Sequence, residues 1–107
     1  MKLTMVTSVL FLSLSSSAFA AREITLIAKD GKFDPETIEI AKDEKVELVI
    51  RNDGSDAEEF ESVELHREKV IPPGKTVRVK IGPLQEGTFP FFGDFHPSTA
   101  KGKIIVK

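Results

Sequence analysis

The chain has 107 residues, with 17 Asp and Glu against 15 Lys and Arg, eight Phe, and no Cys, Trp or Tyr. The formal net charge of −2 and the lack of a basic stripe argue against nucleic-acid binding. Without Cys the protein forms no disulfide and offers no thiolate to a metal, and its length suits one small domain, held by packing alone or by packing plus a bound ion.

The first twenty residues have the order of a secretory signal peptide. Lys2 precedes the apolar run MVTSVLFLSL, which is followed by a Ser-rich stretch and by small residues that end at Ala20. The run is too short to span a membrane, and the alternative, a membrane anchor, lacks a following Cys to carry a lipid. We therefore predict a signal peptide over residues 1–20, cleaved near Ala20, and an exported, periplasmic domain over residues 21–107.

The predicted domain contains no sulfur, because Met1 and Met5 both lie in the predicted signal peptide. Removal of Lys2 leaves 17 acids against 14 bases, a formal charge of −3.

In chain order, hydrophobic residues recur at every second position in short segments, and helical periodicity is almost absent. The segments are EITLIAK, TIEI, KVELVIR, EEFESVEL, TVRVKI, TFPFF and GKIIVK. Turn signals such as NDGSD, IPPGK and LQEG separate them. Short strands with a turn every 8 to 12 residues or so are typical of an all-β sandwich or a small barrel.

The segment EEFESVEL breaks the usual pattern of a half-buried strand. Its alternation places Glu59 and Glu61 on one face, opposite Phe60. Val63 and Leu65 share the face of the two acids, so if they face the core, two carboxylates face it as well. Buried carboxylates take up protons, find partners or bind a cation. The alternative is a bulge at SDAEE that leaves both acids in solvent.

A second group of polar residues lies in PFFGDFHPSTAKG, at residues 90–102. Asp94 and His96 are two positions apart, so both point the same way if the loop begins extended. Carboxylates with an imidazole suit iron in either oxidation state, Cu(II), Mn(II) or Zn(II). The alternative is that Asp94 only caps its own loop, because GDFHPST is rich in ordinary turn formers.

Three further residues allow two interpretations each. His66 is flanked by Arg67 and Lys69, which disfavour a bound cation, so a solvated loop is the preferred interpretation. Glu68 either supports the acidic site or pairs with one of these bases. Phe33 either covers the site, where it would lower the local dielectric, or belongs to the core.

The ordered motifs GKFDPETIEI, KVELVIRND, AEEFESVEL, VIPPGKTVRVKI, EGTFPFFGDFH and AKGKIIV resemble the cupredoxin sandwich over essentially all of residues 21–107. The resemblance implies a Greek-key β-sandwich of about seven to eight strands. Gly93 falls on the copper-binding Cys, His96 on the second His ligand, and the upstream His within about one residue of Glu59. The Met position, near Lys101, has no sulfur either. The resemblance therefore excludes a type 1 blue-copper centre.

The pattern EFES...L..EKV..PG and the end FFG-acid-FHP..AKG are similar to EfeO-type cupredoxin domains of bacterial iron-uptake systems. Some relatives carry Cys at the positions of Phe33 and Asp94, which makes Asp94 a ligand position with oxygen in place of sulfur. This likeness implies a site made of Glu59, Glu61, Asp94 and His96 that binds iron, copper or both. Glu58 is a third acid beside the two on the strand.

The likeness also implies a role in iron uptake, with delivery of the ion to a membrane iron permease or another periplasmic uptake component. Oxidation of Fe(II) would be the catalytic form of that role, but the chain offers no obvious electron acceptor. We therefore expect a binding and transfer protein, not itself membrane-spanning, rather than an enzyme. The alternative function is a metal-free structural or interaction module of a membrane-associated complex.

Overall fold

The computed structural model describes residues 2, 4 and 21–107. The predicted signal peptide and its cleavage near Ala20 therefore lie almost entirely outside the described residues. Residues 21–107 contain nine strands. In the part of the chain that is described, no helix has the length and apolar character needed to cross a membrane.

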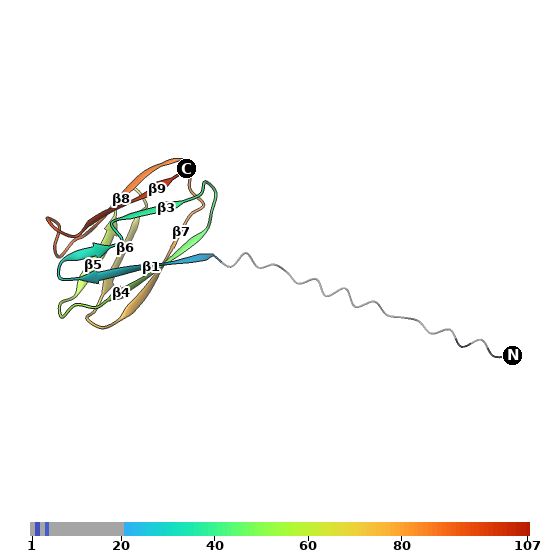
Figure 1. Cartoon of the computed structure of the whole chain (residues 1–107), viewed down its shortest axis with the longest axis horizontal. Coiled ribbons are helices and arrows are strands. Elements are labelled where there is room, and N and C mark those ends of the chain that lie inside the picture. Colours follow the sequence, from blue (N-terminus) through green and yellow to red (C-terminus); the bar gives the residue numbers. More distant parts are fainter. Residues whose placement is uncertain (1, 3, 5–20) are drawn as a thin grey trace.

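The nine strands form two sheets (Figure 1). In chain order they are β1 (Arg22–Lys29), β2 (Lys32–Asp34), β3 (Thr37–Ile40), β4 (Val46–Asn52), β5 (Glu58–Ser62), β6 (Arg67–Ile71), β7 (Thr76–Ile81), β8 (Gly87–Gly93) and β9 (Lys101–Val106). One sheet has the order β2-β1-β4-β7 and the other β3-β9-β8-β5-β6. The pairs β1/β4 and β3/β9 are parallel, and the other pairs are antiparallel.

This architecture confirms the predicted β-sandwich, with more strands than the seven to eight expected. One additional strand is the three-residue β2, which is too short to show a periodic pattern. The other is β6, in which four consecutive residues are exposed because it lies at the edge of its sheet. β2 is thus too short, and β6 too uniformly exposed, for a sequence pattern to identify them as strands.

The core lies between the sheets and confirms the predicted inward faces. Leu26 and Leu48 from one sheet and Ile104 from the other are almost fully buried. Phe33, Phe60 and Phe91 form an aromatic cluster, with ring centroids 5.3 to 6.1 Å apart. Phe33 is therefore a core residue that joins β2 to the opposite sheet.

The orientation of β5 differs from the prediction. Phe60 is fully buried, so Glu58, Phe60 and Ser62 point inward while Glu59 and Glu61 point outward. The strand ends at Ser62, and a turn over residues 63–66 interrupts the period of two, which leaves Val63 63% exposed. The interpretation in which Glu59 and Glu61 share the core face with Val63 and Leu65 does not hold, because the strand ends before Val63. The alternative, a bulge that leaves both acids in solvent, does not hold either, because Glu59 is buried and Glu61 is half-buried.

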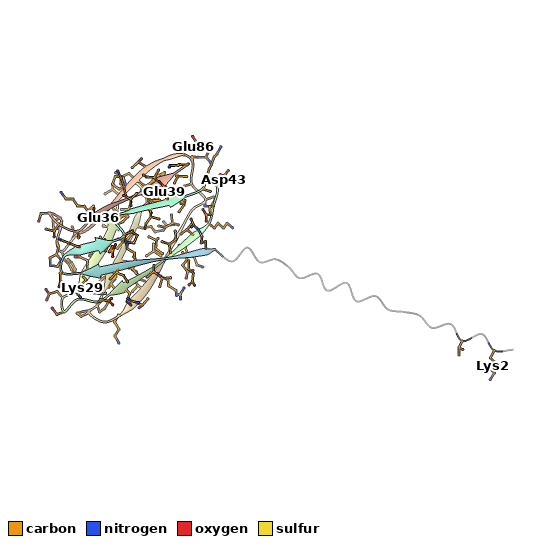
Figure 2. The ribbon with its side chains drawn as sticks, viewed as in Figure 1. Lys2, Lys29, Glu36, Glu39, Asp43 and Glu86 are labelled. Carbon is orange, nitrogen blue, oxygen red and sulfur yellow. The ribbon has the colours of Figure 1, made fainter. Side chains whose placement is uncertain are left out.

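The two ends of the sandwich carry different groups of loops. Figure 2 shows Glu39, Asp43 and Glu86 together at one end and Lys29 at the other. The end near Lys29 also holds the loop between β8 and β9, because Thr99 Oγ1 donates a hydrogen bond to the Gly31 carbonyl oxygen at 2.6 Å. Both candidate sites described below lie at this end.

Candidate metal centre

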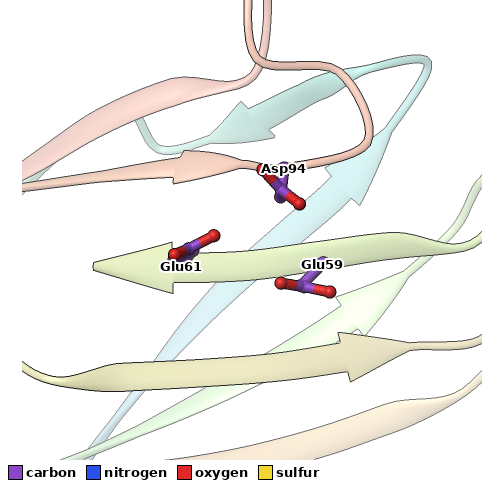
Figure 3. A group of neighbouring side chains, drawn as sticks. All are labelled: Glu59, Glu61 and Asp94. Atoms are coloured by element: carbon purple, nitrogen blue, oxygen red, sulfur yellow. The ribbon is translucent and has the colours of Figure 1, made fainter. Parts of the chain in front are cut away.

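Three carboxylates meet on the outer face of the sheet that contains β5. Glu59 and Glu61 stand at alternate positions of β5, and Asp94 follows the last residue of β8 (Figure 3). The Asp94 amide donates a hydrogen bond to the Glu59 carbonyl oxygen at 2.9 Å, which holds the start of the loop against β5. One oxygen from each of the three side chains lies within 4.8 Å of the other two. We call Glu59, Glu61 and Asp94 the acid cluster.

A fourth acid, Glu68 on β6, adjoins the acid cluster. It is the cross-strand partner of Glu61, and its carboxyl group lies close to that of Glu59. The interaction between the Glu59 and Glu68 carboxyls is the main reason that the pKa of Glu59 rises to about 7, followed by burial and by the charges of Glu68, Asp94 and Glu61. The pKa of Glu61 is also raised, first by burial and then by the charges of Asp94 and Glu68.

These shifts describe a site that is electrostatically unfavourable without a proton or a cation. Because the pKa of Glu59 is raised to about 7, the metal-free cluster retains a proton at a pH where isolated carboxyls have lost theirs. A cation in place of that proton would neutralise several carboxylates at once. Carboxylate oxygens are hard ligands, preferred by Fe(III), Mn(II), Mg(II) and Ca(II).

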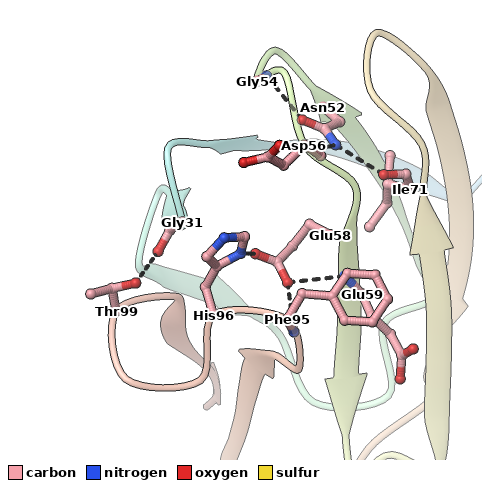
Figure 4. A network of polar contacts seen from close by, with 10 residues as sticks. All are labelled: Gly31, Asn52, Gly54, Asp56, Glu58, Glu59, Ile71, Phe95, His96 and Thr99. Carbon is pink, nitrogen blue, oxygen red and sulfur yellow. Dashed lines mark hydrogen bonds and ion pairs between the residues drawn. The ribbon is translucent and has the colours of Figure 1, made fainter.

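His96 lies apart from the acid cluster. Its Nδ1 is 2.6 Å from Oε2 of Glu58, the inward-facing acid of β5 (Figure 4). The other oxygen of Glu58, Oε1, accepts hydrogen bonds from the amides of Glu59 at 3.0 Å and Phe95 at 3.1 Å. The structure thus brings together three of the four predicted ligands, Glu59, Glu61 and Asp94, and pairs the fourth, His96, with a different acid.

Glu58 fills the space beside Gly93. A Cβ atom built on Gly93 would lie 2.6 Å from Cδ and Oε1 of Glu58 and 2.7 Å from Cβ of Ala100. Such short contacts exclude a larger residue at position 93 unless its neighbours move. The Glu58 carboxylate therefore occupies the volume that a Cys side chain at position 93 would need, at the position that resembles the copper-binding Cys.

The structure decides between the interpretations of His66 and Asp94 that the sequence left open. His66 is exposed in the turn between β5 and β6, with a φ of 54°, in agreement with the solvated-loop interpretation. Asp94 contributes its side chain to the acid cluster, as the ligand interpretation requires. The sequence analysis missed the role of Glu58. Glu58 lies two positions before Phe60, so the period of two along β5 could have placed both side chains on the buried face.

Comparison with known proteins places the chain in a described family. It matches the cupredoxin-like domain family over residues 2–106. An uncharacterised protein of Rickettsia prowazekii (strain Madrid E) is 44% identical to it over 84 residues, which cover 78% of this chain and 67% of that protein.

Solved structures with the same fold include copper proteins. Auracyanin A from Chloroflexus aurantiacus superimposes with a TM-score of 0.70 at 12% identity, covering 82% of this chain and all of that chain. A copper-binding protein solved by NMR in its apo form superimposes with a TM-score of 0.66 at 25% identity, covering 79% of this chain and 86% of that chain. The metal-binding domain of a Cu(I)-exporting P-type ATPase of Streptococcus pneumoniae D39 superimposes with a TM-score of 0.67 at 18% identity, covering 79% of this chain and 84% of that chain. The first and third likenesses, at 12% and 18% identity, concern the fold alone.

Proposed function

Because this chain belongs to the cupredoxin-like domain family, we propose that it is a metal-binding protein whose ion is held by the acid cluster. The observation that carries this proposal is the convergence of Glu59, Glu61 and Asp94 within 4.8 Å. The raised pKa of Glu59, at about 7, supports it, because the cluster holds a proton that a cation can replace. Glu68, at the edge of the cluster, adds a fourth carboxyl group.

The ligand atoms favour a hard ion. The chain has no Cys, so no thiolate is present to bind copper as a type 1 centre. Three carboxylates stabilise Fe(III) more than Fe(II), because the attraction grows with the charge of the ion. Together with the likeness of the sequence to iron-uptake domains, this chemistry supports iron as the ion, and we place the protein in periplasmic iron uptake.

The position of the acid cluster suits transfer of an ion to a partner. It lies on the outer face of a sheet next to a loop, and Asp94 is exposed while Glu61 is half-buried. An ion there is reachable by the ligands of a second protein, such as a membrane iron permease or another uptake component. Oxidation of Fe(II) would need an electron acceptor, and residues 21–107 contain no sulfur, Tyr or Trp. We therefore propose binding and transfer rather than catalysis.

Calorimetric titration with Fe(III) nitrilotriacetate, anaerobic Fe(II) and Mn(II) tests this function. Glu61→Gln and Asp94→Asn each remove one ligand charge, and we expect each to weaken binding by about tenfold or more. Glu86→Gln is the matched control, because Glu86 precedes the first residue of β8 whereas Asp94 follows its last, and Figure 2 shows Glu86 at the end of the sandwich opposite Lys29. Equal binding by the parent and the acid-cluster variants, or no binding by the parent, would contradict the proposal.

One observation favours a second function, that of an interaction module. The exposed large hydrophobic residues in the described part of the chain are Val63, Val70 and Phe95. Val70 is the cross-strand partner of Glu59, and Phe95 follows Asp94, so two of the three adjoin the acid cluster. Apolar side chains around an acidic centre suit docking to a partner surface with complementary charge.

Replacement of the apolar residues separates the two functions. If the surface only docks a partner, Val70→Ser and Phe95→Ser should abolish growth under iron limitation, while the Fe(III) titration shows no binding by any form of the protein. If the ion is bound, the same variants retain the parent's Fe(III) affinity in the purified protein.

A further inference from the structure

A polar pocket lies next to His96 at the Lys29 end of the sandwich. Its volume is about 140 Å³. Its walls come from the turn between β1 and β2, the loop between β4 and β5, and the side chains of Glu58, His96 and Thr99. Neither Glu59 nor Glu61 lines it, since these side chains point to the other face of β5. The pocket is therefore separate from the acid cluster.

The His96 ring is fixed by contacts on one nitrogen and on one face. Glu58, whose side chain is only 5% exposed, contacts Nδ1 at 2.6 Å. An acceptor at Nδ1 selects the tautomer that carries its proton there and leaves the Nε2 lone pair free. The ring also packs against Gly31, where a built Cβ would lie 3.2 Å from Cγ and Cδ2 of His96. Because the His96 side chain is 35% exposed, its free edge is accessible from the pocket.

Asp56 lines the same pocket from a loop that is also held in place. The buried Asn52 side chain donates hydrogen bonds to the Asp56 carbonyl oxygen at 2.8 Å and to the Ile71 carbonyl oxygen at 2.9 Å. Its Oδ1 accepts one from the Gly54 amide at 2.9 Å. Figure 4 shows the Asp56 side chain across the gap from the His96 ring. An imidazole nitrogen and a carboxylate thus border one small space.

We propose that Nε2 of His96 and the carboxylate of Asp56 form a second cation site, for a borderline divalent ion such as Zn(II) or Cu(II). A histidine oriented by a carboxylate through its other nitrogen is the usual arrangement at sites for these ions. The only three-residue group of converging ligand atoms among the described residues is the acid cluster. The pocket site therefore has two protein ligands, and water fills the other positions.

The charges around the pocket are consistent with a cation. Its lining contains the acids Asp30, Asp56 and Glu58 against one base, Lys29. Glu58 has its hydrogen bonds satisfied within the protein, so its role is to position His96 rather than to bind the ion. This site does not depend on the proposed function of the acid cluster, because the two share no ligand.

Titration of the purified protein with Zn(II), followed through the imidazole nitrogen resonances by NMR, tests this proposal. We expect Zn(II) to shift Nε2 of His96 while Nδ1 stays protonated and bonded to Glu58. His96→Gln should abolish this binding, and Asp56→Asn should weaken it by about tenfold. His66→Gln is the matched control and should bind as the parent does, because His66 lies in the turn between β5 and β6 and does not line the pocket.

A positioning role for Glu58 has its own signature. Glu58→Gln retains the size of the side chain but removes its charge. We expect it to lower the Zn(II) affinity by about 10- to 100-fold and to leave the binding stoichiometry unchanged. Glu61→Gln, which weakens the acid cluster, should leave the His96 shift intact, so the two sites can fail separately. Coordination through Nδ1, Zn(II)-induced shifts of the pocket residues that survive His96→Gln, or no His96 shift at millimolar Zn(II) would each overturn the proposal.

Discussion

Adjacent residues of β5 place the same functional group in opposite environments. The Glu58 carboxylate points inward, where two backbone amides and the His96 ring satisfy its oxygens. The Glu59 carboxyl points outward, where its neighbours Glu68, Asp94 and Glu61 are acids that raise its pKa. The more deeply buried acid is therefore the one with the least need of an ion. Burial alone does not identify a metal ligand; the partners of the carboxylate do.

The largest expected effect is that of removing the inward carboxylate. Glu58→Ala leaves the amides of Glu59 and Phe95 without their acceptor and opens a cavity beside Gly93, so we expect the free energy of unfolding to fall by about 3 to 5 kcal/mol. Denaturant unfolding measures it. Glu61→Ala, on the outer face, is the control and should leave the metal-free protein at least as stable as the parent. Equal destabilisation by the two variants would remove the distinction between the faces.

Crowding at Gly93 gives the next largest effect. A methyl group there would meet Glu58 and Ala100 at 2.6 to 2.7 Å, so Gly93→Ala should cost about 1 to 3 kcal/mol. Gly54→Ala is a control with more space, because the nearest contact of its added Cβ is 3.2 Å, to Oδ1 of Asn52. Combining Gly93→Ala with Glu58→Ala should show a favourable coupling, since one of the two clashes disappears. Strict additivity of the two changes would show that the Glu58 side chain does not occupy this space.

The pH dependence of stability should identify the outer acids. The folded protein holds the Glu59 proton up to about pH 7, whereas the unfolded chain loses it near pH 4.5. The unfolded state thus binds fewer protons between these values, so the stability of the metal-free protein should fall as pH rises from 4.5 to 7 and then level off. Unfolding curves across this range measure the slope. Glu59→Gln should reduce it, and an unchanged slope in that variant would assign the effect to other groups.

The smallest expected effect is on the stability of the metal-free protein when both outer acids lose their charge. Glu59→Gln combined with Glu61→Gln removes like-charge repulsion across β5 and β6, so the melting temperature should rise slightly. The same variant should lose any stabilisation by Fe(III) or Mn(II), measured as the difference in melting temperature with and without the ion. Retention of that difference would place the ion elsewhere.

The sequence allowed the fold to be predicted well wherever burial alternates along a strand. The inward faces around Leu26, Leu48 and Val79 followed directly from their period of two. The exposed edge strand β6 has no such period, so the strand was not predicted, and a place for Glu68 beside the acidic site was only one of two interpretations.

The candidate site was harder to predict, because local pattern does not reveal which residues meet. The face assignment on β5 followed Val63 and Leu65 across a turn, when Phe60 alone was the correct guide. The convergence of Asp94 with β5 rests on the pairing of β8 with β5, a long-range contact that was expected from the resemblance to cupredoxins and not from alternation. The contact between Glu58 and His96 depends both on the inward orientation of Glu58 on β5 and on the pairing of β8 with β5.

The most direct test of the acid cluster as the metal site is paramagnetic broadening of backbone amide resonances by one equivalent of Mn(II), an ion that prefers oxygen ligands. Broadening should be strongest at Glu59, Glu61 and Asp94, weaker at Glu68, and absent at Glu86. Uniform weak broadening, or broadening centred on a different surface of the protein, would contradict the assignment of the metal to the acid cluster.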